Sequence, residues 1–89
     1  MSTKKSYIYH TDPGHGWLEV SRSELEKLNL SDEITSFSYA KGLKVFLEED
    51  CDMGLFLEAL QKAGIEAQLT EIHLDDTPIR GYEPYYPLK

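Results

Sequence analysis

Short stretches of alternating apolar and polar residues flank a glycine- and proline-rich loop near the N-terminus. Residues 6–10 and 17–20 have the alternation that predicts two short β-strands. The loop between them, HTDPGHG, places proline and glycine at the second and third positions of a turn that begins at Asp12. These positions suit a type II turn, in which the glycine takes a positive φ. The pattern therefore predicts a β-hairpin.

A helix is predicted directly after this hairpin. Ser21 and Glu24 have the spacing of a capping box, and Val20 and Leu25 have the spacing of a hydrophobic staple. The pattern ends near Asn29. The helix is therefore expected to be short, about two turns.

Two further strands are expected over residues 34–39 and 43–48, joined by a short turn. In the second of these strands Val45 and Leu47 point to one face of the sheet. Phe46 points to the other face, which is otherwise polar. That second face is therefore expected to be partly covered as well.

A second helix is the clearest element of the sequence. Asp50 or Asp52 is placed to cap its N-terminus, and Gly64 is placed to end it. Residues 65–74 follow as a strand whose alternation slips after Leu69, which predicts a bulge or a twist. The core-facing stripe of the helix, at i, i+3, i+4 and i+7 spacing, consists of Met53, Phe56, Leu57 and Leu60.

The predicted order of elements is β-β-α-β-β-α-β. This order indicates a small α+β sandwich with an antiparallel or mixed sheet and two helices on one face. The single domain is expected to span residues 1–76. Residues 77–89 contain three prolines and three tyrosines and are expected to form an extended tail, which either packs on the domain or binds a partner.

The composition is that of a folded globule with one small core. The chain has 89 residues, of which 40% are hydrophobic and 28% are charged. Its one cysteine, Cys51, excludes an internal disulfide, and no stretch has the apolar run of a signal peptide or a membrane helix. We therefore expect a cytoplasmic protein, and no motif in the sequence points to a cofactor.

The net charge of −7 originates in one part of the chain. Residues 48–76 contain nine acidic side chains and one basic one, whereas residues 1–47 are neutral. A negative field repels phosphate backbones, so we expect a basic protein as the partner, and neither nucleic acid nor a membrane. The simpler explanation of the negative charge is that it keeps the protein soluble. The expected partner-binding residues are Glu48, Glu49, Asp50, Asp52, Glu58, Tyr82, Tyr85 and Tyr86.

Two sets of side chains offer an alternative from the enzyme class. His10, Asp12 and His15 are zinc or iron ligand types, although their spacing matches no recurrent ligand pattern. The simpler interpretation is that His10 is half-buried in a strand, Asp12 caps the turn and His15 lies at the loop tip. Cys51 with His73 would be a nucleophile and its base, but the carboxylates around the cysteine oppose a thiolate. A non-enzymatic protein is therefore the leading expectation, and a metal-dependent enzyme is the alternative.

Three stretches of the chain resemble a family of small uncharacterised proteins from bacteria, phages and other mobile elements. They are HTDPGHGWLEV (10–20), SYAKGLKVFLEEDCD (38–52) and MGLFLEALQKAG (53–64). The resemblance implies a mobile-element setting and brings no activity or site residues. Small acidic proteins in that setting often block host defence proteins. We therefore expect that this protein mimics DNA and inhibits a basic host protein. A homodimer formed through an open sheet edge is a further alternative.

Overall fold

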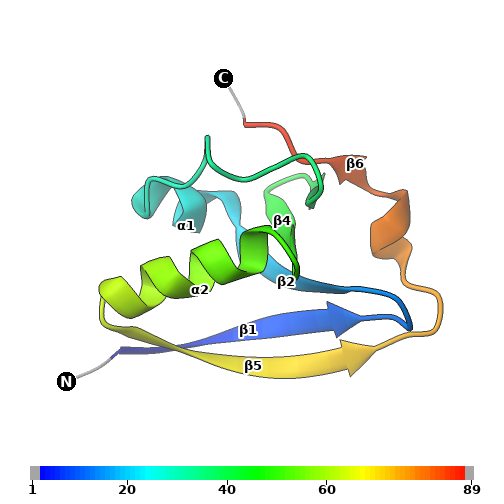
Figure 1. Cartoon of the computed structure of the whole chain (residues 1–89), viewed down its shortest axis with the longest axis horizontal. Helices are drawn as coiled ribbons and strands as arrows, with labels where there is room; N and C mark the ends of the chain where they lie inside the picture. Colours follow the sequence, from blue (N-terminus) through cyan, green and yellow to red (C-terminus); the bar gives the residue numbers. More distant parts are fainter. Residues whose placement is uncertain (1–2, 88–89) are drawn as a thin grey trace.

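The computed structural model describes residues 3–87 of the chain. These residues form a mixed sheet of six strands, and both helices pack on one face of this sheet (Figure 1). The sheet order is β5-β1-β2-β4-β3-β6, in which β1 and β5 are parallel and the other neighbours are antiparallel. The predicted α+β class is confirmed, and a 3-10 helix η1 and a strand β6 are added to the predicted order. The elements are β1 (Thr3–Thr11), β2 (Gly16–Ser21), α1 (Arg22–Lys27), β3 (Tyr39–Lys41), β4 (Lys44–Glu48), α2 (Asp52–Lys62), β5 (Ile65–His73), η1 (Pro78–Gly81) and β6 (Glu83–Pro84).

The larger apolar core lies between the sheet and the two helices. Leu25 of α1 and Phe56 of α2 are fully buried against Leu18 and Leu47 of the two central strands. Tyr7 of β1 extends this core, with its ring edge-to-face to Phe56 at a centroid distance of 5.5 Å. Burial of these side chains supplies the main driving force that holds the helices to the sheet.

A smaller aromatic cluster lies on the opposite face of the sheet. Trp17 of β2 and Phe46 of β4 point to this face, and Ile79 of η1 covers them. Tyr39 and Tyr82 pack at the margin of the cluster. The prediction that the Phe46 face is also covered is therefore confirmed.

The C-terminal segment is an integral part of the domain. Strand β6 pairs with β3, and Tyr85 is only 2% exposed. Its hydroxyl donates a 2.7 Å hydrogen bond to the carbonyl of Ser31. The structure therefore extends the domain past the predicted boundary at residue 76, through residue 87. Residues 1–2 of the predicted domain and 88–89 of the predicted tail lie outside the described residues.

The caps of the two helices differ in how well the sequence predicted them. The capping box of Ser21 and Glu24 is present at α1. At α2 the prediction of an aspartate cap is wrong, because Cys51 occupies the N-cap position without a side-chain hydrogen bond. Gly64 has a φ of 76° just after the α2 C-cap, as predicted.

Within residues 3–87, neither helix has the length and apolar composition that crossing a bilayer requires.

The hairpin turn is held by a side chain rather than by glycine geometry. The Asp12 carboxylate accepts hydrogen bonds from the backbone N–H groups of Gly14 (2.9 Å) and His15 (2.8 Å). Gly14 does not take a positive φ, so the predicted type II turn is wrong. The alternative interpretation of Asp12 as a turn-capping residue is confirmed.

Two strand predictions are also corrected. Residues 34–38 form turns and bends, so the strand expected over 34–39 is reduced to β3, because hydrogen bonds of Thr35 and Ser38 to Asp52 of α2 hold this segment as a loop. Strand β5 shows no bulge, since its pairing with β1 runs without interruption from Ile65 to His73. Its irregular pattern instead reflects exposure, because most of β5 is solvent-accessible on both faces.

Candidate functional site

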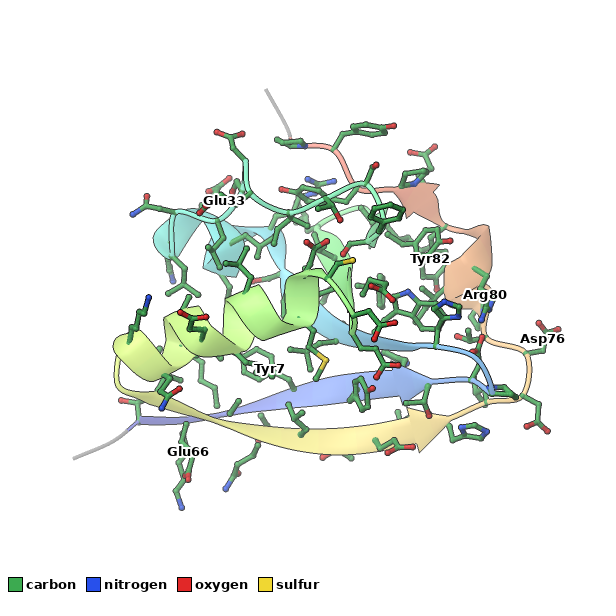
Figure 2. All side chains as sticks on the ribbon, viewed as in Figure 1. Tyr7, Glu33, Glu66, Asp76, Arg80 and Tyr82 are labelled. Carbon is green, nitrogen blue, oxygen red and sulfur yellow. The ribbon has the colours of Figure 1, made fainter. Side chains whose placement is uncertain are left out.

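Five exposed acidic side chains gather at one end of the sheet. Strands β1 and β5 are parallel and stop there together, at Thr11 and His73, and β4 stops there at Glu48, next to the start of β2. The loops that follow these strands therefore lie close together, and Figure 2 shows Asp76 and Arg80 at this end, away from Glu33 and Glu66. We call the exposed carboxylates here the acidic end; they are Glu49, Asp50, Glu71, Asp75 and Asp76.

The Tyr9 side chain crosses the neighbouring strand β2 and holds the Glu49 carboxylate in place. Its ring lies over Gly16, and its hydroxyl donates a hydrogen bond to Glu49. A Cβ at position 16 would collide with this ring, so the glycine is required for close approach. Burial and the Glu49 carboxylate raise the pKa of the Tyr9 hydroxyl far above its usual value, which keeps it protonated as a donor.

A buried aspartate holds the loop before β3. The Asp52 carboxylate, 2% exposed, accepts hydrogen bonds from the Thr35 N–H (3.1 Å), the Thr35 hydroxyl (2.8 Å) and the Ser38 hydroxyl (2.5 Å). Ser38 in turn accepts from the backbone N–H of Glu48 at 3.0 Å. Phe37 lies between the two anchored residues and is 69% exposed. The network therefore presents an aromatic ring to solvent from a firmly held loop.

Arg80 of η1 joins the C-terminal segment to the hairpin loop. Its Nε donates to one Asp12 oxygen at 2.5 Å, and its Nη2 donates to the other at 3.0 Å. These hydrogen bonds outweigh burial and hold the pKa of Asp12 well below its usual range. Nη2 also lies 2.9 Å from Nδ1 of His15. Because a guanidinium only donates, Nδ1 must accept and the proton of this imidazole lies on Nε2.

Trp17 forms the floor beneath these groups. The His15 ring stacks on it at a centroid distance of 5.9 Å, and the Arg80 guanidinium lies over it at 5.3 Å. Trp17 is 1% exposed, yet its indole Nε1 has no hydrogen-bond partner among the described residues. A buried donor without an acceptor is uncommon in folded proteins.

A cleft of about 300 Å³ opens beside this tryptophan. Its lining includes the Arg80 guanidinium and the carboxylates of Glu48 and Asp50. Phe37 and Tyr39 add two aromatic rings to this lining. The lining consists of His15, Trp17, Phe37, Tyr39, Glu48, Asp50, Cys51 and Arg80.

The three predicted metal ligands do not converge. His10 lies on β1, where its Nε2 is 2.9 Å from a Glu19 oxygen and its ring packs edge-on to Phe46. Asp12 is occupied by Arg80 and the turn, and His15 stacks on the tryptophan. Among residues 3–87, no group of three or more His, Cys, Asp and Glu side chains is arranged to hold a metal ion.

Cys51 and His73 also have separate surroundings. Cys51 is exposed, and its hydrogen bond with Glu48, together with partial desolvation and the charges of Glu48, Asp52 and Asp50, raises the pKa of its thiol. This agrees with the prediction that the nearby carboxylates oppose a thiolate. His73 Nδ1 instead lies 2.9 Å from the Thr11 hydroxyl, and its Nε2 lies 3.5 Å from Asp75.

The predicted partner-binding acids divide into two groups. Glu49 and Asp50 are exposed at the acidic end, and Glu58 is exposed on α2, where it pairs with Lys62 at 3.1 Å. Asp52 is enclosed by its hydrogen bonds, and Glu48 is buried and accepts from the backbone N–H of Asp50 at 3.1 Å. Asp52 therefore shapes the site from within, whereas Glu48 reaches the surface only where it lines the cleft.

The predicted aromatic interface of the tail is divided as well. Tyr85 is buried in the core, and Tyr82 packs half-buried on Phe46, with the Lys41 ammonium 5.0 Å from its ring centroid. Only Tyr86 is left largely exposed. Two of the three tyrosines therefore attach the C-terminal segment to the domain.

The predicted partner-binding set omits several residues of the cleft. Arg80 joins Asp12 across 68 positions of sequence, and no local pattern announces such a pair. Phe37 was predicted within a strand, where an aromatic ring is ordinary. Trp17 was assigned to the start of a strand, although its position as the only tryptophan beside a charged loop was a usable signal.

Comparison with known proteins adds no relative. Neither a protein-family model, nor a curated protein, nor a solved structure matches this chain. The resemblance to the mobile-element family thus stays a prediction. The site must be interpreted from its own geometry.

Proposed function

We propose that this protein is a non-enzymatic interaction module that binds a basic protein through its acidic end. The observation that supports this most is the separation of charge along the sheet. Five exposed carboxylates gather at one end, where Arg80 is paired with Asp12, whereas Lys4, Lys5 and Lys44 lie toward the opposite strand ends. A one-sided field of this kind steers a partner of opposite charge and orients its approach.

The side chains with catalytic potential are engaged in holding the fold. Asp12 closes the hairpin and binds Arg80, and Asp52 anchors the loop before β3. The raised pKa of the Cys51 thiol makes it a poor nucleophile. A rigid surface with engaged titratable groups suits binding better than proton transfer.

The proposed partner is a host protein with a basic surface, such as one that binds nucleic acid. The mobile-element resemblance of the sequence motivates this choice, and the acidic end would then occupy a groove that otherwise holds phosphates. Binding of this type depends strongly on salt, because exposed charges are screened beyond about 8 Å at physiological ionic strength. Inhibition of such a host protein is the corresponding biological role.

A charge-matched pair of variants tests the proposal. In the end variant, Glu49→Gln, Asp50→Asn, Asp75→Asn and Asp76→Asn remove four charges from the acidic end. In the remote variant, Glu26→Gln, Asp32→Asn, Glu33→Gln and Glu66→Gln remove the same number elsewhere. The measurement is the affinity for an oligo-arginine peptide over a range of salt concentrations.

The end variant is expected to bind the peptide at least about tenfold more weakly than the remote variant, from several contributions of about 0.2–1 kcal/mol each. Equal losses in the two variants would mean that only the total charge matters, and the acidic end would then have no special role. An affinity that is insensitive to salt would also contradict the proposal.

A second candidate function is homodimerisation through β5. This strand is the outermost of the sheet, and its far edge faces no other strand within residues 3–87. Leu69 and Ile72 are exposed along it, and Leu74 is exposed just after its end. An open edge with apolar side chains can pair with a second copy. Light scattering after size exclusion tests this, with an Ile72→Lys variant expected to abolish any dimer that the natural chain forms.

A further inference from the structure

We propose that the cleft beside Trp17 receives one arginine side chain of the basic partner, with its guanidinium between Phe37 and Tyr39 and facing Asp50. This inference rests on the proposed function, because it names the residue that anchors the partner at the acidic end. The cleft of about 300 Å³ adjoins that end, since Asp50, one of the carboxylates of the acidic end, lines it.

The charges of the cleft leave it negative although it contains an arginine. Arg80 makes two hydrogen bonds to Asp12, and the low pKa of this carboxyl keeps it ionised, so the pair is neutral. Asp50 is exposed, with no basic side chain among the described residues paired to it. Glu48, which also lines the cleft, adds a second carboxylate. The unbalanced charge therefore favours a cation.

The aromatic side chains of the cleft make a planar cation the best fit. Phe37 lies at the cleft with 69% of its surface exposed, and Tyr39 is half-buried beside it. A guanidinium stacks on aromatic faces and binds a carboxylate through parallel hydrogen bonds, whereas an ammonium is compact and more strongly hydrated. Trp17 already illustrates the match, because its own ring carries the Arg80 guanidinium.

The cleft is also held ready for a ligand. Asp52 fixes Thr35 and Ser38 on either side of Phe37, so an arriving side chain does not have to order this loop. Rings that are presented in this way, exposed but firmly held, are typical anchors of interfaces, because little conformational entropy is lost on binding.

An anionic ligand fits the cleft less well. Two of the three guanidinium nitrogens of Arg80 already make hydrogen bonds. Nε donates to Asp12, and Nη2 donates to Asp12 and His15. An anion would also lie next to Glu48 and Asp50, which line the same space. The repulsion from these carboxylates opposes the attraction of one neutralised arginine.

The experiment uses an oligo-arginine peptide and the matching oligo-citrulline peptide, which has the same planar shape without the charge. Trp17 is the only tryptophan of the chain and lines the cleft, so its fluorescence reports occupancy directly. The expected result is a saturable change in Trp17 fluorescence with the arginine peptide and none with the citrulline peptide. An oligo-lysine peptide should bind more weakly than the arginine peptide.

Two pairs of single variants locate the binding. Phe37→Ala and Asp50→Asn alter the cleft, and each is expected to weaken binding about three- to tenfold. Leu43→Ala removes an equally exposed apolar side chain elsewhere, and Asp75→Asn removes a charge from the acidic end outside the cleft. Leu43→Ala is expected to leave the affinity unchanged, whereas Asp75→Asn, which removes one charge of the acidic end, is expected to weaken binding about twofold.

The outcomes separate this inference from the proposed function. If Asp50→Asn and Asp75→Asn weaken binding equally and Phe37→Ala has no effect, the cleft is not the anchor, although the acidic end still binds. If oligo-lysine binds as tightly as oligo-arginine, the assignment of a planar guanidinium is overturned. If the natural chain binds oligo-arginine no better than oligo-citrulline, both the inference and the proposed function fail.

Discussion

The two faces of the sheet differ in what covers them. The face under α1 and α2 is packed with aliphatic and aromatic side chains such as Leu18, Leu47 and Phe56. The other face carries the smaller Trp17 cluster, which η1 covers, with a charged cleft at its margin. Stability therefore resides mainly on the first face, while the second presents the groups available to a partner. The two faces should respond differently to substitution.

The largest difference is expected between two phenylalanines. Phe56→Ala removes a fully buried ring from the helix-covered core and should lower the free energy of unfolding by about 3–5 kcal/mol. Phe37→Ala removes an exposed ring, so its effect should be within about 0.5 kcal/mol. Urea denaturation of both variants measures this. Comparable losses would contradict the division between the two faces.

A smaller loss is expected at the loop anchor. Asp52→Ala removes three hydrogen bonds and leaves the buried Ser38 hydroxyl without its acceptor. The expected cost is about 2–3 kcal/mol of unfolding free energy. Asp32→Ala, at an exposed position, is the matched control and should change stability little. If both variants are as stable as the natural chain, Asp52 does not hold the loop.

Two glycines give the next contrast. Gly16→Ala would force Tyr9 out of its position over β2, at an expected cost of about 1–3 kcal/mol. Gly54→Ala, in helix α2 with nothing within 4 Å of the added Cβ, should instead stabilise the protein by about 0.5–1 kcal/mol. Thermal unfolding followed by circular dichroism distinguishes the two signs, and a stabilised Gly16→Ala variant would refute the close approach of Tyr9.

The smallest effect is a dependence on pH. The pKa of Asp12 is lowered in the folded chain by its hydrogen bonds with Arg80, so its contribution is complete above the unfolded-state pKa of about 4. The contribution is lost as the pH falls below that value toward the folded-state pKa. The difference in stability between the natural chain and an Asp12→Asn variant should therefore shrink on acidification. A difference that stays constant in urea titrations down to low pH would show that ionisation of Asp12 is irrelevant.

The sequence predicted the elements that depend on local signals. The capping box at Ser21 and the terminal glycine Gly64 involve residues a few positions apart, so one-dimensional patterns suffice for them. The apolar stripe of α2 was visible for the same reason. The hairpin was predicted correctly, although its turn depends on the Asp12 side chain and not on glycine.

The site was less predictable because its parts come together only in three dimensions. Asp52 looks like one acid among several in the run EEDCD, and only the fold turns it inward to Thr35 and Ser38. Arg80 lies in a segment that was assigned to a tail, and it meets Asp12 through tertiary packing of η1. Net charge predicts a basic partner, whereas burial decides which acidic side chains are accessible at the surface.

The most direct test of the account compares two double variants with the same change in charge. Phe37→Ala/Asp50→Asn alters the cleft, and Leu43→Ala/Asp75→Asn alters exposed positions outside it. Both should remain folded, and the measurement is the affinity of each for the oligo-arginine peptide. We expect a loss of more than about tenfold for the first variant and of less than about threefold for the second. Equal losses would contradict the claim that the partner is anchored in the cleft beside Trp17.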